Sequence, residues 1–203
     1  MKITVSGKSI EKAIENGLKQ LGTTKNKVNI HVVEQPSKGF LGLIGSKEAK
    51  VELKLKDPIE EAKTFIHDAI HAMDLDVKVN VIQKDGMLYF NLTGSELGIL
   101  IGKRGQTLDA LQYLVKIIAN RYSDKYIKIV VDAEEFRARR KKTLEKLSLR
   151  LADKVMKQKR DVMLEPMNPH ERKIIHAQLQ DHKYVRTYSK GEEPNRRIII
   201  TLK

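Results

Sequence analysis

The chain has 203 residues, of which 40% are hydrophobic, and its net charge is +13. It contains no cysteine, which excludes disulfide bridges and thiolate metal sites, and no stretch approaches the roughly 20 apolar residues that cross a bilayer. Because the charge is strongly positive, nucleic acid is the expected partner. Because the first residues lack a signal-peptide core, we expect a cytoplasmic location.

Residues 1–56 are predicted to form a small βαββ domain. Apolar residues at helical spacing predict one helix, and alternating apolar residues predict three strands. The helix is expected over residues 9–21 and the strands over residues 2–5, 28–34 and 48–55.

A glycine-rich apolar loop, Gly39-Phe40-Leu41-Gly42-Leu43-Ile44-Gly45, lies between the last two of these strands. A phosphate-binding loop needs the order Gly-x-x-x-x-Gly-Lys-[Ser/Thr], and the spacing here is different. Exposed apolar loops more often cap a core or contact a protein. We therefore predict a protein-partner loop made of Lys38, Gly39, Phe40, Leu41 and Gly42.

Residues 57–133 are predicted to form a second domain with the element order αββααβ. Asp85-Gly86 between two alternating apolar runs is a strong hairpin signal. The helices are expected over residues 59–73, 95–101 and 106–121, and the strands over residues 77–83, 87–92 and 126–131.

The turn between the last two helices has the sequence Gly102-Lys103-Arg104-Gly105. Backbone amides at the start of a helix attract phosphate oxygens, and glycine lets a sugar-phosphate chain approach the backbone closely. Lysine and arginine add charge without reading base sequence. We predict RNA contacts at Gly102, Lys103, Arg104, Gly105 and Gln106, with bases lying over Ile99, Leu100 and Ile101.

A lone Gly-x-x-Gly is most often only a tight turn between helices. Here the surrounding αββααβ order, over residues 58–132, resembles the bacterial type II KH domain. The Gly-x-x-Gly loop of KH domains clamps about four nucleotides of single strand. The resemblance therefore implies a single-stranded RNA site at this turn.

Residues 134–160 are predicted to form a basic amphipathic helix. They hold 11 basic and 4 acidic side chains, and so carry much of the positive charge of the chain. One apolar stripe, made of Phe136, Leu144, Leu147, Leu151 and Val155, runs along the helix. A charge run is often only a solvated face, but this concentration favours a surface that faces a polyanion.

A further helix is predicted to start at Asn168, with Pro169 as its first residue. Ile175 and Leu179 can face a core, and we expect Arg172 and His176 to share the other side, where they could grip a phosphate or stack on a base. The surrounding sequence resembles the R-three-H domain, a single-stranded nucleic-acid binder named for its Arg-xxx-His motif. The residues that carry this resemblance are 164–167, 172–176, 187–191, Pro194 and Arg196, ahead of a predicted strand over 197–202.

These two modules behind Lys38-Gly39-Phe40-Leu41-Gly42 resemble the Jag family, also called KhpB or EloR, over the entire chain. The family usually shows Lys-Lys-Gly-Phe-Leu-Gly, and Ser37 replaces the first lysine. The resemblance implies an RNA-binding regulator of the bacterial cytoplasm, linked to cell elongation and division. It further implies a KhpA-like small KH protein and the YidC/SpoIIIJ membrane insertase as partners, recruitment to the membrane or septum, and a homodimer as one assembly.

Together these features predict an α+β chain of three small domains: Jag-N over 1–56, type II KH over 57–133, and R-three-H with its leading basic helix over 134–203. The predicted function is non-catalytic binding of single-stranded RNA at two sites. These are the KH turn and the helical pair Arg172 and His176, together with Arg196. Two tethered weak sites gain affinity through effective concentration.

Two other functions stay open from the residues alone. A nuclease could use Asp132, Glu134 and Glu135, although acids at the start of a cationic helix are expected for dipole reasons. A protein adaptor could act through the Phe40 loop. We expect no cofactor and no metal, because His67 and His71 fall on the polar side of a helix without a third ligand nearby.

Overall fold

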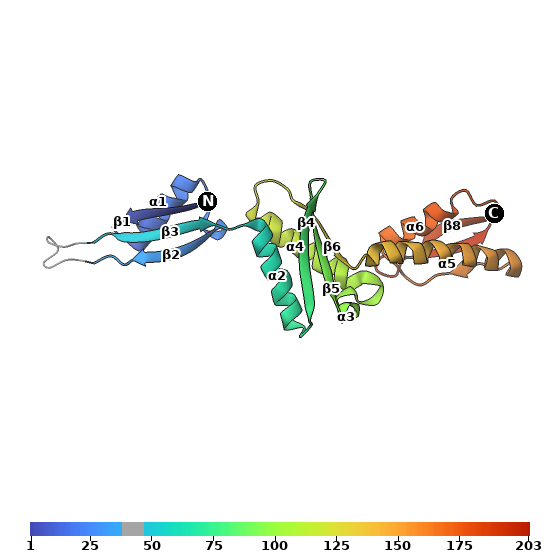
Figure 1. The fold of residues 1–203 in the computed structure, drawn as a ribbon. Coiled ribbons are helices and arrows are strands. Elements are labelled where there is room, and N and C mark those ends of the chain that lie inside the picture. Colours follow the sequence, from blue (N-terminus) through green and yellow to red (C-terminus); the bar gives the residue numbers. More distant parts are fainter. Residues whose placement is uncertain (38–46) are drawn as a thin grey trace. The chain divides into compact units, whose positions relative to one another are not determined.

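The computed structural model describes residues 1–37 and 47–203 (Figure 1). Within them the strands form three separate three-stranded sheets, as the predicted three-domain α+β architecture requires. The chain divides into two compact units, residues 1–100 with 107–131 and residues 101–106 with 132–203. The predicted partner loop, Lys38 to Gly42, lies outside the described residues.

The amino-terminal domain has the predicted βαββ order, with β1 (Lys2–Gly7), α1 (Ile10–Leu21), β2 (Val28–Glu34) and β3 (Ala49–Leu55). A short 3-10 turn, Lys25–Lys27, precedes β2. Strand β3 is central and pairs antiparallel with both β1 and β2. The helix lies close to the sheet because Gly17 has no side chain: a Cβ there would come within 2.0 Å of Leu53 Cδ1.

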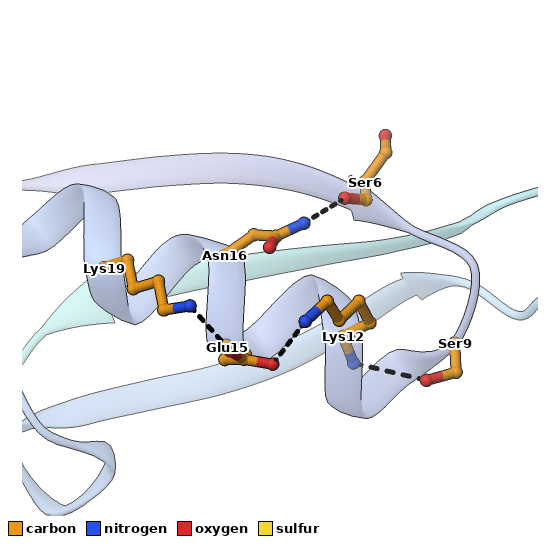
Figure 2. Close-up of polar contacts among 6 residues, drawn as sticks. All are labelled: Ser6, Ser9, Lys12, Glu15, Asn16 and Lys19. Carbon is orange, nitrogen blue, oxygen red and sulfur yellow. Dashed lines mark hydrogen bonds and ion pairs between the residues drawn. The ribbon is translucent and has the colours of Figure 1, made fainter.

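Polar contacts define the start and outer face of α1 (Figure 2). The Ser9 hydroxyl accepts a hydrogen bond from the Lys12 amide at 3.2 Å, which caps the helix. Glu15 forms ion pairs with Lys12 at 2.8 Å and Lys19 at 2.7 Å. Hydrogen bonds from these two lysines lower the pKa of Glu15 to about 2. Both pairs are exposed, so they add little to stability.

The second domain has the predicted αββααβ order. Its elements are α2 (Pro58–Ala72), β4 (Val77–Lys84), β5 (Met87–Gly94), α3 (Leu97–Ile101), α4 (Gln106–Tyr122) and β6 (Lys128–Ala133), with a 3-10 turn at Lys103–Gly105 and the sheet order β4-β5-β6. Asp57 caps α2 by accepting a hydrogen bond from the Ile59 amide at 2.8 Å. Phe90, Leu92 and Leu108 are completely buried.

Strand β6 starts two residues later than predicted. The Asn120 side chain accepts a hydrogen bond from the Ile127 amide at 2.7 Å and donates one to the Ile127 carbonyl at 3.1 Å. A side chain thus satisfies the backbone where strand pairing was expected.

The carboxy-terminal domain consists of α5 (Phe136–Gln158), β7 (Val162–Met163), α6 (Pro169–Leu179), β8 (Val185–Lys190) and β9 (Arg197–Leu202), with the sheet order β7-β9-β8. Four residues of the predicted apolar stripe of α5, Leu144, Leu147, Leu151 and Val155, pack in one core with Ile175 and Leu179 of α6. Phe136, the fifth, is not part of this core, and its ring lies beside Gly105. Val185, Ile198 and Ile200 form the sheet side of this core. None of the described helices is long and apolar enough to cross a membrane.

Candidate nucleic-acid interface

The Gly102–Gly105 turn joins α3 to α4 in a conformation that needs its glycines. Gly102 has φ 68° and ψ −170°, which is essentially restricted to glycine. Gly105 has φ 85°, and a Cβ there would lie 2.7 Å from Cε1 of Phe136, the first residue of α5. Arg104 is left-handed at φ 59° without being glycine, a conformation that stores strain and is common in ligand-binding loops.

The polar side chains of the turn lie in different environments. Lys103 and Gln106 are exposed, whereas Arg104 is half-buried. The Arg104 guanidinium donates a hydrogen bond to the Pro166 carbonyl and forms an ion pair with the Glu165 carboxylate. Among the described residues Lys103 forms no ion pair, so it is the cation of the turn that is available to a phosphate.

The apolar wall predicted for the bases is narrower than expected. Leu100 is 1% exposed and belongs to the core of its domain. Ile99 is 53% exposed and Ile101 is half-buried. The prediction that Leu100 faces bases is therefore wrong, because in a five-residue helix the middle of the apolar run turns toward the core.

Helix α6 begins as predicted, with the Asn168 side chain accepting a hydrogen bond from the Glu171 amide at 2.8 Å. Arg172, however, is only 6% exposed, so it does not lie on a solvent-facing side with His176. Its guanidinium donates to the Met167 carbonyl and pairs with the Glu193 carboxylate, both at 2.6 Å. Arg172 thus holds the segment before α6 and the loop before β9 in place.

His176 contacts two hydroxyl groups of β8. Its Nδ1 lies 2.7 Å from Thr187 Oγ1 and its Nε2 lies 3.0 Å from Ser189 Oγ. Burial lowers the pKa of His176, and the positive charges of Arg172 and Arg196 lower it further. The histidine therefore lies in a positive field, and Arg196 is the exposed cation of that cluster.

Sequence reasoning did not identify Thr187 and Ser189 as partners of His176. The available signal was their spacing of two residues, which places both hydroxyls on one face of a strand. Because the strand that carries them was not predicted, this spacing could not be interpreted as a shared face.

Of the acids considered for a nuclease, Asp132 is bound to the backbone, whereas Glu134 and Glu135 are exposed. Asp132 accepts hydrogen bonds from the amides of Ala133 at 2.9 Å and Arg137 at 3.3 Å, so it caps the start of α5. Across the described parts of the chain, no group of three or more histidine, aspartate or glutamate side chains is placed to hold a metal ion. His67 and His71 are both exposed.

Comparison with known proteins places the chain in a family. The Jag N-terminus matches residues 5–55, the KH domain of KhpA/KhpB matches residues 60–131, and the R-three-H domain matches residues 142–202. The chain is 48% identical over 204 residues to RNA-binding protein KhpB of Clostridium symbiosum, covering 99% of this chain and 91% of that protein. It is 43% identical over 204 residues to RNA-binding protein KhpB of Bacillus subtilis (strain 168), covering 99% and 98%.

A third relative, RNA-binding protein KhpB of Lactiplantibacillus plantarum, is 34% identical over 128 residues, which is 63% of this chain and 39% of that protein. The two longer alignments and the three matched domains agree on the same family. The chain therefore belongs to the Jag family, which includes these KhpB proteins, and carries its Jag-N, KH and R-three-H domains in that order.

Proposed function

We propose that this chain is a non-catalytic, single-stranded RNA-binding protein with two phosphate sites, one at the KH turn and one at the R-three-H helix. The observation that carries the proposal is the Gly102–Gly105 turn, which presents exposed Lys103 at the amino end of a 17-residue helix in a KhpA/KhpB-type KH domain. The names of the relatives, RNA-binding proteins, support the same function.

At the KH turn, the amino end of α4 attracts a phosphate through its dipole and the amides of its first helical turn. The amides of Gly105 and Gln106 donate to the Gly102 and Lys103 carbonyls, so the first-turn amides beyond Gln106 are the candidate donors. No side chain caps the start of the preceding 3-10 turn. Gly102 allows the close approach of the RNA backbone, Lys103 supplies the charge, and Gln106 lies exposed on the next turn. Arg104 reaches a phosphate only when it leaves Glu165, so we assign it a smaller share of the affinity.

At the R-three-H helix, exposed Arg196 is the direct phosphate contact, and His176 borders the same positive field. Arg172 is a positioning residue there, because its donors are taken by Met167 and Glu193. Bound phosphate would favour the protonated imidazole and raise the pKa of His176.

The regulatory part of the proposal follows the family. As a Jag protein, the chain would act after transcription, in processes of cell elongation and division, and meet the YidC/SpoIIIJ insertase at the membrane or septum. Crosslinking bound RNA in cells and sequencing it tests this role, and recovery of no RNA above background would contradict it.

A KH-type protein partner is a second candidate activity, favoured by an exposed apolar strip on α4. Tyr113, Leu114 and Ile117 are 65%, 45% and 48% exposed and share one side of the helix. A strip of this kind suits a small KH protein of the KhpA type, or a second copy of this chain. Replacing Leu114 with glutamate should abolish co-purification with KhpA. The affinity of the variant for a short single-stranded RNA should stay as in the wild type.

The direct test of the RNA proposal is a pair of charge reversals with the same change in net charge. In full-length protein, Lys103→Asp should weaken binding to a single-stranded oligouridine roughly tenfold and reduce the salt slope by about 1. Lys84→Asp, at the exposed β4–β5 hairpin, should leave the affinity nearly unchanged. Equal losses in both variants, measured by fluorescence anisotropy over a salt series, would show that only net charge matters.

A further inference from the structure

The sheet of the carboxy-terminal domain has one covered face and one open face. Helices α5 and α6 pack on the face that carries Val185, Ile198 and Ile200. Because side chains alternate along a strand, Arg186, Tyr188 and Lys190 of β8 point to the opposite face. All three are exposed.

An apolar row crosses the open face from edge to edge. Tyr188 of β8 pairs in register with Ile199 of β9, and Ile199 pairs with Met163 of β7. Ile199 is 6% exposed between its two neighbours, whereas Tyr188 is 44% and Met163 is 59% exposed. In the described parts of the chain, the Tyr188 hydroxyl has no hydrogen-bond partner, so nothing fixes the ring to the protein.

Cations border this row on β8 and β9. Arg186 and Lys190 lie two residues to either side of Tyr188, which is about 7 Å along a strand. Lys190 is directly opposite Arg197 in the sheet register, an arrangement of like charges that destabilises a sheet. Within the described residues none of these three cations forms an ion pair, although Arg197 donates to the Asn195 carbonyl at 3.2 Å.

Acidic side chains lie on the other edge of the face. Asp161 and Glu165 flank β7, and Glu165 is paired with Arg104. The edge formed by β8, which carries Tyr188, is therefore the positive edge. It suits an anionic ligand that also contains planar aromatic rings.

We propose that the open face, made of Met163, Arg186, Tyr188, Lys190, Arg197 and Ile199, is a stacking platform for single-stranded nucleic acid. A base stacks on Tyr188, and the phosphates on either side of it meet Arg186 and the Lys190–Arg197 pair. An exposed aromatic between cations is the arrangement by which single-strand binders hold bases without reading sequence. An acidic protein would use the cations but would leave the ring without a stacking partner.

This platform is separate from the Arg-xxx-His site. Thr187 and Ser189, which contact His176, lie on the covered side of β8 and alternate with the residues of the platform. The inference rests on the proposed RNA-binding function and adds a second contact surface within the same domain, on the opposite side of one strand.

The test compares ring removal with hydroxyl removal in the full chain. Tyr188→Ala should weaken binding of a labelled oligouridine of about 15 nucleotides by roughly 5- to 100-fold, because a stacked base is lost. Tyr188→Phe should bind within about twofold of the wild type, because the ring stays and the hydroxyl has no partner. Tyr126→Ala removes an exposed tyrosine (72% exposed) outside this domain and is the control.

Two further measurements keep the inference falsifiable. Thermal unfolding checks that each variant is folded, and ultraviolet crosslinking of wild-type protein to 4-thiouridine RNA should map to the peptide that contains Tyr188. Unchanged affinity of Tyr188→Ala, or no crosslink on β8, would overturn the platform while a loss in Lys103→Asp still supports the KH site. Absence of any RNA binding by the wild type would overturn both.

Discussion

Arg104 and Arg172 each bind a backbone carbonyl and a carboxylate of their own chain. Arg104 contacts Pro166 and Glu165, and Arg172 contacts Met167 and Glu193. Both guanidinium groups thus hold neighbouring carbonyls of the segment that leads into α6. An arginine is suited to this role because its fork of donors satisfies two acceptors at once.

Replacing Arg172 should therefore affect stability more than RNA contact. Arg172→Ala leaves the Met167 carbonyl without its donor in a buried site, and we expect a loss of about 2 kcal/mol in the free energy of unfolding. Lys173→Ala, one residue further and exposed, should change it by less than about 0.5 kcal/mol. Urea unfolding of the two variants measures the difference, and equal stabilities would contradict a structural role.

The lowered pKa of His176 predicts a pH dependence of stability. Since the folded state binds the proton more weakly than the unfolded chain, stability is complete above the unfolded pKa of about 6.5 and falls as the pH drops below it. When the pH is lowered from 7.5 to 5.5, the melting temperature of the His176→Gln variant should fall less than that of the wild type, because glutamine does not titrate. By NMR, the His176 pKa should lie below 6.5 and rise when RNA binds. An unshifted pKa in the free protein would remove the basis for this prediction.

At the scale of elements, the success of the sequence predictions depended on how each strand is buried. The strands of the first two domains alternate apolar and polar residues, and their pattern predicted them. Strand β8 was missed because its covered face carries the hydroxyls of Thr187 and Ser189, which serve His176 rather than an apolar core. Strand β7 has two residues, too few for any period.

Two helical glycines predict opposite effects of the same substitution. Gly98 in α3 has open space around it, so Gly98→Ala should stabilise the protein by up to about 1 kcal/mol through helix propensity. Gly17 in α1 lies against Leu53 and Val5 in a closed core, so Gly17→Ala should destabilise it by about 1–3 kcal/mol despite the better propensity. Chemical denaturation of both variants provides the comparison. A stabilising Gly17→Ala would show that the Leu53 side chain moves aside.

At the scale of the whole molecule, the domain order places two proposed RNA sites on one chain with a basic helix between them. The Jag-N, KH and R-three-H families match in that order over nearly all of the sequence. When two weak sites share one strand, the second binding event is intramolecular, and affinity rises by roughly 100-fold or more without any new contact.

This tethering predicts a length dependence of RNA affinity. The wild type should bind a 30-nucleotide oligouridine much more tightly than a 6-nucleotide one, and Arg196→Asp should remove most of that advantage by disabling the second site. Lys103→Asp should remove it as well, because either loss leaves a single site. Anisotropy titrations with both RNA lengths test this. A length advantage that persists when Lys103→Asp and Arg196→Asp are combined in one protein would point to binding elsewhere on the basic surface.

The sequence by itself determined the order of the three domains, most element positions, and the glycine turn with its cations, because periodicity, caps and turn residues are local signals. Only the tertiary structure decided that Arg172 is buried, that Arg104 is paired with Glu165, and that His176 lies between two hydroxyls. These facts depend on partners far along the chain, and a side chain's spacing on its own helix does not reveal what the opposite element places beside it.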